Sequence, residues 1–291
     1  MTTKPSFWTE RSRNFRTSAR LHLQHFIAQN TVGHLLDSEV EKAVAGSQDL
    51  KIAELACGNG VWLTDLHTDF SKKGISFSQL DGYDINPGNF PNPSRLPKSV
   101  TLRELDILAR PLPAEMLGIY DVVHVRGFVS IVYNNDTTPL LSTALALLKP
   151  GGYLQWEEAK GDGFVAEAPS PDISTTNCEA VLALMNTVSH SRGIVSDWVD
   201  VMDQHLKKQG FEDVRMSFTK FREQDLKAWT EDILMVWDEL EGLFPSKEED
   251  PNAKMTREAW VDLFYRAVGE TEQGVVVHMK GITAVVGRKA S

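Results

Sequence analysis

The chain has 291 residues, an ordinary globular composition and a formal net charge of −10 at pH 7. Its length suits one large α/β domain, and because lysine and arginine are scattered along an acidic chain, a nucleic-acid partner is not expected. No apolar run is long enough to span a membrane, and the first residues lack an apolar signal core, so we expect a cytoplasmic protein without a membrane partner.

The N-terminal part of the chain predicts an irregular segment followed by helices. Residues 1–15 are polar with scattered aromatics and no helix-capping pattern. Apolar positions recur at helical spacing between Thr17 and Ala45, which predicts two helices before the first strand. His22 and His25 lie three residues apart and share a helix face. These helices are expected to roof a ligand site.

The most informative segment is 52–62, which has the pattern of a strand, a glycine loop and a helix start. Glu54 lies near the end of the strand, and Gly58 and Gly60 lie in the loop. Glycine permits close approach of backbone N–H groups to a ligand, and a helix N-terminus favours a carboxylate or phosphate. Cys57 is interpreted as a small buried filler in this loop. The segment predicts a site for a small-molecule cofactor.

The second strand ends in an acid that strengthens this prediction. Asp84 lies some two dozen residues beyond Gly60, where a doubly wound sheet places a carboxylate on ribose hydroxyls. A dinucleotide fingerprint is incomplete because Leu63 stands where its third glycine belongs. A phosphate loop is excluded because no lysine lies between Lys51 and Lys72.

Strands and helices alternate from Leu50 to Glu158, which predicts a parallel sheet with ligands at the carboxyl ends of its strands. The third strand end, 102–107, supplies another acid, and 120–126 forms a fourth strand. His124, inside that apolar strand, is predicted to be a satisfied core histidine. Two cysteines are too few for a disulfide framework, and no Cys/His group has zinc-ligand spacing, so reduced thiols and no metal are expected.

The C-terminal half predicts helices, two further strands and a helical insertion. Residues 212–218 alternate as a strand, and 275–287 are expected to form one long final strand with a bulge at Gly281. The long connection between them carries Trp229 and Trp237 and is interpreted as a helical cap. These tryptophans are expected either to pack in the core or to line a substrate pocket. We divide the single domain 1–291 into a roof (1–49), a cofactor-binding core (50–160), a second half of the core (161–220), a cap insertion (221–274) and a final strand (275–291).

This ordered series of motifs resembles the class I S-adenosylmethionine-dependent methyltransferases. From about Arg20 onwards, the segments 20–25, 60–66, 80–85, 120–126 and 150–158 look like the fungal branch of secondary metabolism, which includes small-molecule methyltransferases and LaeA-like regulators. Ala56 stands where that family often has its first loop glycine. The resemblance implies a Rossmann-like, seven-stranded, mostly parallel sheet whose last strand is antiparallel.

The resemblance also implies a cofactor, S-adenosyl-L-methionine, and methyl transfer to an O, N or S atom of a small-molecule acceptor in biosynthesis. The cofactor-binding residues that it implies are Glu54, Ala56, Gly58 and Gly60 for the methionine moiety, Asp84 and Ile85 for the ribose side, Asp106 and Ile107 for the adenine, and Val125 and Arg126 beside the reacting methyl group.

A general base is needed only for an acceptor that is not already ionised. The candidates are His25, either Glu157 or Glu158, and His190, and strand alternation directs only one of the two glutamates to a given face. We place His25, Glu158 and Arg126 in the catalytic set. Two alternatives stay open: a cofactor-binding enzyme that catalyses a rearrangement or pericyclic step without methyl transfer, and a LaeA-like regulator with protein partners.

Overall fold

The computed structural model describes residues 14–291. The predicted irregular segment 1–15 therefore lies almost wholly outside the described residues, and helix α1 (Phe15–Val32) already includes its last position. Among the described residues, no helix is both long and apolar enough to cross a membrane. Cys57 and Cys178 are both free and buried.

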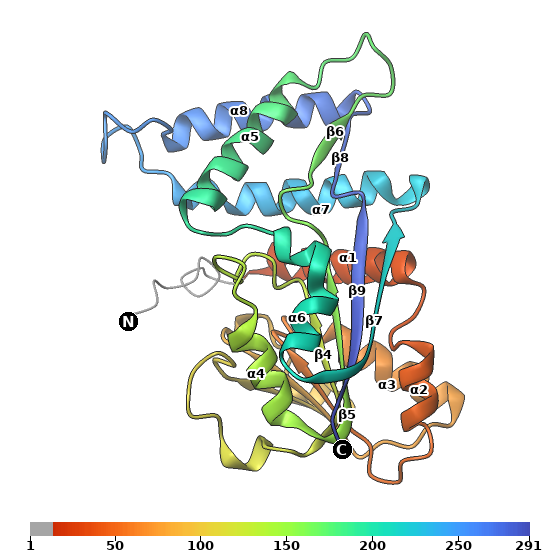
Figure 1. Cartoon of the computed structure of the whole chain (residues 1–291). Coiled ribbons are helices and arrows are strands. Elements are labelled where there is room, and N and C mark those ends of the chain that lie inside the picture. Colours follow the sequence, from red (N-terminus) through yellow and green to blue (C-terminus); the bar gives the residue numbers. More distant parts are fainter. Residues whose placement is uncertain (1–13) are drawn as a thin grey trace.

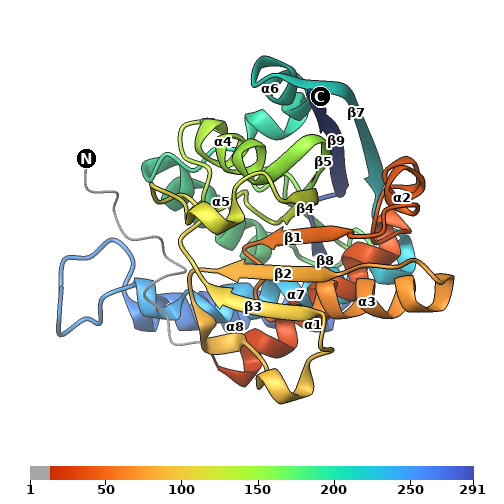
Figure 2. The same ribbon diagram turned by 90° about the horizontal axis from the view of Figure 1, so that it is seen from below.

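A seven-stranded sheet forms the lower part of the molecule (Figures 1 and 2). Its strand order is β3-β2-β1-β4-β5-β9-β7. Strand β9 is antiparallel to both of its neighbours, and the other strands share one direction, which confirms the predicted mostly parallel sheet with an antiparallel last strand. The strands are β1 (Lys51–Leu55), β2 (Gln79–Asp84), β3 (Val100–Glu104), β4 (Tyr120–Arg126), β5 (Leu148–Glu158), β7 (Phe211–Lys220) and β9 (Gly281–Lys289).

Helices cover both faces of this sheet because its central strands are apolar on both sides. Buried side chains of α2 (Ser38–Val44) and α3 (Val61–Lys73) pack on one face, around Ile52 and Val122. Buried side chains of α4 (Thr138–Leu147) and α6 (Met202–Lys208) pack on the other face, around Leu55 and Trp156. Helix α1 crosses above the sheet and separates it from a second, largely helical layer (Figure 1).

A second, largely helical layer lies beyond α1 (Figure 1). It consists of α5 (Thr176–Ser191), α7 (Leu226–Glu239), α8 (Arg257–Glu272) and the short antiparallel pair β6 (Val165–Glu167) and β8 (Val276–His278). The cap therefore extends beyond its predicted bounds 221–274. Helix α5 joins it because the Glu270 carboxylate accepts the backbone N–H groups of Asn177 and Cys178, which caps α5 from α8.

The long final strand predicted for 275–287 is wrong: the chain forms two strands in two different sheets. Lys280 adopts a left-handed φ of 72°, which ends β8 after His278. Gly281 then starts β9, where an added Cβ would lie 2.3 Å from the carbonyl oxygen of Thr219. At the position of the expected bulge, the chain instead passes from one sheet to another. Strand β8 pairs with β6, whereas β9 pairs with β5 and β7.

The two cap tryptophans occupy separate apolar clusters. Trp229 stacks on Phe221, with ring centroids 4.1 Å apart, beside Ile27 of α1. Trp237 packs instead in the cluster that joins α5, α7 and α8. Both are buried, so the structure supports core packing and places them in no common pocket.

Replacing Gly281 with alanine is expected to destabilise the protein by about 1–3 kcal/mol, because the new methyl group would overlap backbone that cannot move aside. The control is Gly269→Ala in α8, where no atom lies within 4 Å of the added Cβ. That change should stabilise the helix by about 0.5–1 kcal/mol. Urea unfolding of both variants measures the difference, and equal effects would contradict the close approach at Gly281.

Candidate functional site

The glycine loop between β1 and α3 turns sharply through left-handed backbone. Ala56, Gly58 and Gly60 have φ angles of 55°, 58° and 73°. The Gly60 N–H donates to the Cys57 carbonyl at 2.8 Å, and the Gly60 carbonyl accepts the first helical hydrogen bond, from Thr64, at 3.1 Å. A tight turn therefore delivers the start of α3 to the carboxyl edge of the sheet.

Asp84, the last residue of β2, holds this loop in place. Its Oδ2 accepts the Gly58 N–H and its Oδ1 accepts the Asn86 N–H, both at 2.9 Å. The side chain is buried at the carboxyl edge. Asp84 thus ends β2 as the sequence predicted, and it also anchors the glycine loop, which the sequence did not reveal.

The loop glycines were expected to leave space for a ligand, but protein side chains occupy the positions where their Cβ atoms would lie. A Cβ on Gly58 would lie 3.1 Å from Leu21 Cδ1 of α1, and one on Gly60 would lie 2.8 Å from Leu102 Cδ1 of β3. Both glycines therefore serve a close fit with protein side chains as well as a left-handed turn. A ligand would meet the loop from its remaining side.

The other predicted cofactor residues follow neighbouring parallel strands and so lie at the same edge. Ile85 follows Asp84 and is 39% exposed. Asp106 follows β3 and accepts the Leu108 N–H at 2.9 Å, while the neighbouring Ile107 is buried. Val125 and Arg126 end β4, beside β1.

A cluster of ionisable side chains, which we call the charged group, lies beneath the loop on the face covered by α3. Its members are Glu54, His124, Arg126, Glu157 and His25. His124 stacks on Trp62, with ring centroids 3.8 Å apart. Its nitrogens lie 3.6 Å from Glu54 Oε1 and 3.9 Å from Glu157 Oε2, too far for hydrogen bonds. His124 is thus a core histidine, but not the satisfied one that was predicted. Among residues 14–291, Glu54 Oε2 also has no hydrogen-bond partner, and burial raises the pKa of this carboxyl group.

The charged group continues from β5 to α1. Arg126 Nε donates to Glu157 Oε2 at 2.7 Å, and Arg126 Nη1 lies 3.4 Å from His25 Nδ1. His25 Nε2 lies 3.2 Å from Asp65 Oδ2. Burial by itself would raise the pKa of Glu157, but Arg126 and His124 lower it to about 2. Burial and the nearby Arg126 charge lower the pKa of His25 to about 4, although Asp65 opposes the shift.

Glu158 faces away from this charged group, which resolves the choice that strand alternation left open. Its oxygens accept the backbone N–H groups of Phe128 and Val129 and the Trp156 indole N–H. Burial raises its pKa to about 8, although these donors favour the charged form. Glu158 thus anchors the loop after β4, and its role as a base stays a prediction.

The remaining base candidates, His25 and His190, differ in their hydrogen-bond partners and in their exposure. Both ring nitrogens of His25 have partners, one in Asp65 and the other in Arg126. His190 is exposed near the end of α5 and belongs to the helical layer. The structure therefore brings His25 and Arg126 together with the loop and leaves His190 outside this group.

Sequence reasoning named Glu157 only as a candidate base and His124 only as a core residue, and it missed Asp65 and the contacts that join these residues to the predicted site. Strand register carries the signal, because Glu54 pairs with His124 and Arg126 pairs with Glu157 in adjacent parallel strands. Paired positions share a face of the sheet. Asp65, by contrast, is brought in by α3, and nothing in the sequence pattern linked it to His25.

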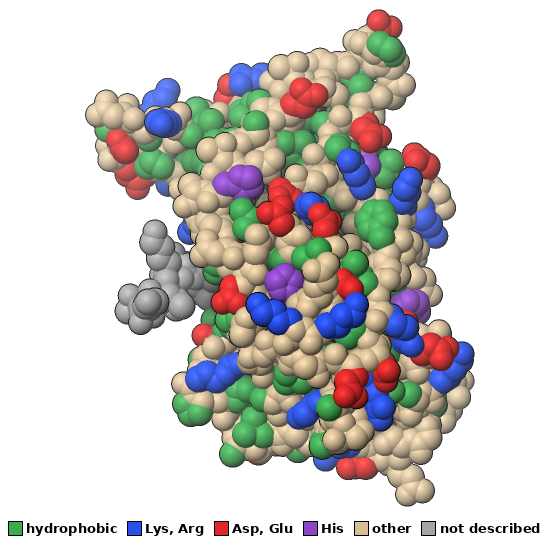
Figure 3. Space-filling view, in the orientation of Figure 1, with side chains coloured by type: hydrophobic (Ala, Val, Ile, Leu, Met, Phe, Trp, Pro, Cys, Tyr) green, Lys and Arg blue, Asp and Glu red, His purple; other side chains and the backbone are tan. Residues whose placement is uncertain are grey.

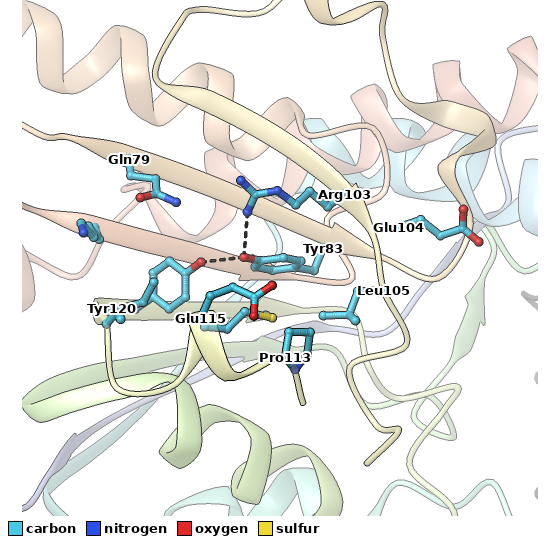
Figure 4. A pocket seen from close by; sticks show the side chains of 11 residues that line it. Gln79, Tyr83, Arg103, Glu104, Leu105, Pro113, Glu115 and Tyr120 are labelled. Atoms are coloured by element: carbon cyan, nitrogen blue, oxygen red, sulfur yellow. Dashed lines mark hydrogen bonds between the residues drawn. The ribbon is translucent and has the colours of Figure 1, made fainter. Parts of the chain in front are cut away.

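A separate cavity of about 550 Å³ lies on the opposite face of the sheet, next to β2, β3 and the start of β4 (Figure 4). Its walls include Tyr83 and Tyr120, whose hydroxyl oxygens lie 2.6 Å apart, and Arg103, which donates to Tyr83 at 3.3 Å. Tyr120 in turn donates to the buried Asp81 at 2.6 Å. None of the predicted site residues lines this cavity, which reaches the carboxyl end of β3 only through Glu104 and Leu105.

The carboxyl edge fits a ligand that carries a cation and ribose hydroxyls. The unpartnered Oε2 of Glu54 is a buried acceptor suited to an ammonium group, and Asp84 places a second buried carboxylate beside the loop glycines. Together with the glycine loop, these are the residues that would hold S-adenosylmethionine.

Comparisons with known proteins point to the same class. No family model matches the chain. Methyltransferase grgD of Penicillium sp is 31% identical over 195 residues, which cover 66% of either chain. N-methyltransferase tcpN of Claviceps purpurea is 34% identical over 153 residues, which cover 52% of this chain and 51% of that one. N-methyltransferase verN of Clonostachys rogersoniana is 29% identical over 149 residues, which cover 50% and 48%. The match thus spans between about half and two thirds of these relatives.

Solved structures show the same fold. A complex between the Haloferax volcanii Trm112 methyltransferase activator and a protein described as a methyltransferase contains a chain that matches with a TM-score of 0.50 and 13% identity, covering 99% of this chain and 100% of that one. The seven-stranded sheet, with its glycine loop after the first strand, has the Rossmann-like fold of that chain. The chain belongs to the class I S-adenosylmethionine-dependent methyltransferases.

The buried His25 should make stability depend on pH. Because its pKa is about 4 in the folded chain and about 6.5 when exposed, the folded state disfavours the charged ring. The contribution of the neutral His25 ring to the free energy of unfolding is fully present above about pH 6.5. It is lost as the pH falls towards 4, by up to about 1.4 kcal/mol per pH unit.

The measurement is the unfolding free energy of the wild type and of His25→Gln across this range. The wild type should lose stability relative to the variant as pH falls, while the exposed His22→Gln on the same helix should keep the wild-type slope. Parallel curves for the wild type and His25→Gln would show that His25 is not held neutral by its surroundings.

Proposed function

We propose that this protein transfers a methyl group from S-adenosylmethionine to a nitrogen atom of a small-molecule metabolite, in fungal secondary metabolism. The observation that carries the proposal is the link between Asp84 and Gly58, which joins the ribose-binding acid to the glycine loop at the carboxyl edge. The curated relatives support it, since tcpN and verN are named N-methyltransferases.

The cofactor, when bound, supplies an electrophilic methyl group on a positively charged sulfur. Asp84 would accept hydrogen bonds from the ribose hydroxyls, and Glu54 would accept one from the ammonium group. Val125 and Arg126 would border the reacting centre, and Asp106 with Ile107 the adenine. The buried carboxylates of Glu54 and Asp84 favour a cation at this edge.

A neutral nitrogen acceptor suits the state of the candidate bases. An amine attacks through its own lone pair and loses its proton after transfer, so alignment matters more than prior deprotonation. An alcohol would need a base, yet both nitrogens of His25 are engaged and Glu158 is committed to the loop after β4.

A small-molecule acceptor also agrees with the surface. The face seen in Figure 3 carries lysines and arginines interspersed with aspartates and glutamates, without a broad basic patch. A nucleic-acid acceptor would call for gathered cations, whereas the chain has a formal net charge of −10.

Calorimetry with S-adenosylhomocysteine tests the cofactor assignment. Asp84→Ala should bind at least about tenfold more weakly, because hydrogen bonds to a charged group contribute about 1.5–3 kcal/mol. Glu104→Ala is the control, since Glu104 pairs with Asp84 in the sheet but is exposed on β3. If folded Asp84→Ala binds as tightly as Glu104→Ala, Asp84 does not contact the cofactor.

Transfer itself is tested with a trideuteromethyl cofactor and a panel of secondary amines, phenols and thiols. Mass spectrometry should show the label on amines. Cofactor binding without label on any acceptor class would contradict methyl transfer to these nucleophiles and favour the non-transferring enzyme or the regulator.

A further inference from the structure

The connection from β3 to β4 covers its face of the sheet only partly. A parallel sheet is usually covered on both faces by the helices of its crossovers. In the described chain, residues 105–119 contain one short 3-10 helix, η3 (Ala114–Met116), and no α-helix. Pro111 and Pro113 disfavour a longer helix here because proline lacks a backbone N–H donor. The cavity of about 550 Å³ lies beside this connection, which supplies Glu115 to its wall.

The sheet face that borders the cavity is polar. Gln79, Asp81 and Tyr83 alternate along β2 and so point to one face. Arg103 pairs with Tyr83 in β3. Asp81 is fully buried, and Gln79 Nε2 and the Tyr120 hydroxyl both donate to its Oδ2. Its Oδ1 lies 3.5 Å from Arg103 Nη1 and has no hydrogen-bond partner among the described residues. The buried carboxylate thus attracts the Arg103 guanidinium to the sheet.

The two tyrosine hydroxyl hydrogens are used inside this network. Burial raises the pKa of both phenols, so each keeps its hydrogen at neutral pH. The Tyr120 hydroxyl donates to Asp81, so the Tyr83 hydroxyl, 2.6 Å away, donates to Tyr120. The Tyr83 oxygen then accepts Arg103 Nη1–H at 3.3 Å (Figure 4). The phenols therefore offer no donor to the cavity, and they hold one edge of the guanidinium.

The opposite edge of the Arg103 guanidinium has no hydrogen-bond partner in the described chain. Only Nη1 is engaged, and the side chain, which lines the cavity, is half exposed. Arginine is always charged, and its Nε–Nη2 edge matches the two oxygens of a carboxylate. Because Nη1 is already held, little side-chain freedom remains to be lost when an anion binds. Lys51, which lies 3.5 Å from Asp49 Oδ2, adds a second cation to the lining.

The rest of the lining limits what such an anion can be. Glu104 and Glu115 supply two exposed carboxylates. Figure 4 shows Glu104 directed away from Arg103, and Glu115 beside Tyr83. A second negative charge on a ligand would be repelled by Glu115, so one carboxylate is favoured over two. Apolar side chains suit an apolar body on the same ligand: Leu105, Pro113, Met116 and Ile119.

We propose that this cavity is a second ligand site, which binds a small monocarboxylate with an apolar body through hydrogen bonds from Arg103 Nε and Nη2. The inference goes beyond the proposed methyl transfer and does not depend on it, because none of the predicted cofactor residues lines the cavity. Occupancy of the two sites is therefore independent.

The test compares three probes: 3-phenylpropionate, its amide 3-phenylpropionamide, and the dicarboxylate phenylsuccinate. Ligand-observed NMR at pH 7 measures their affinity for the wild type, with and without excess S-adenosylhomocysteine. 3-Phenylpropionate should bind at least about tenfold more tightly than the amide, because only the carboxylate makes charge-assisted hydrogen bonds with Arg103. It should also bind more tightly than phenylsuccinate, and S-adenosylhomocysteine should not displace it.

Four outcomes with the wild type would overturn the proposal, and none of them depends on a variant. They are equal affinities for the acid and its amide, no binding of the acid, phenylsuccinate binding at least as tightly, and displacement by S-adenosylhomocysteine. Failure of S-adenosylhomocysteine itself to bind would refute the proposed function and leave this inference standing.

The variant Arg103→Gln removes the charge and should lower the affinity for 3-phenylpropionate at least about tenfold, to that of the amide. Arg95→Gln is the matched control. Arg95 is exposed and lines a different cavity of about 780 Å³, next to α1 and α3. That variant should keep the wild-type affinity. Binding lost in Arg95→Gln and kept in Arg103→Gln would move the site to the other cavity and overturn the proposal.

Arg103→Gln also leaves the buried Asp81 without its cation, so a second variant separates binding from folding. Glu115 is exposed and lies outside the hydrogen-bonded network. Glu115→Gln should raise the affinity for phenylsuccinate at least about twofold, because a repulsive charge is removed, and should leave that of the amide unchanged. An unchanged affinity for phenylsuccinate would show that the acid does not bind in this cavity.

Discussion

The contacts that hold α1 at the carboxyl edge are the interaction on which both layers of the molecule depend. Leu21 fills the space beside Gly58, and His25 lies between Asp65 and Arg126. From the other side of the helix, Arg20 reaches Glu239 of α7. One helix therefore fixes the glycine loop, the end of β4 and the helical layer relative to one another.

The charges beneath that helix explain how a polar edge can be buried. Glu54, His124, Arg126 and Glu157 share one face of the sheet because their strands are parallel and in register. Arg126 compensates Glu157, whereas Glu54 keeps an oxygen without a partner. The edge is thus left with a buried acceptor that suits the proposed cationic cofactor.

Much of the core could be predicted from the sequence because its signals are local. The alternation of predicted strands and helices, together with the glycine loop, located the parallel strands. The carboxyl ends of parallel strands lie at one edge of the sheet. Asp84 could therefore be placed at this edge from its position at a strand end, and the family resemblance added Val125 and Arg126. The antiparallel last strand followed from the resemblance to the methyltransferase family.

The rest depended on contacts between distant segments. Nothing local shows that Glu270 of α8 caps α5, or that β8 leaves the main sheet to pair with β6. Alternation separated Glu157 from Glu158 but did not say which would meet Arg126. That choice was set by the register of β4 and β5. Trp229 and Trp237 have helical spacing typical of a shared face, yet packing with α1 and with α5 draws them into different clusters.

The central claim is that the carboxyl edge beneath α1 binds the cofactor. The most direct measurement is a crystal structure of the full chain with S-adenosylhomocysteine. Its ribose hydroxyls should lie within hydrogen-bond distance of Asp84, with its amino group near Glu54. A ligand bound instead in the cavity beside Tyr83 and Tyr120, on the other face of the sheet, would contradict the claim.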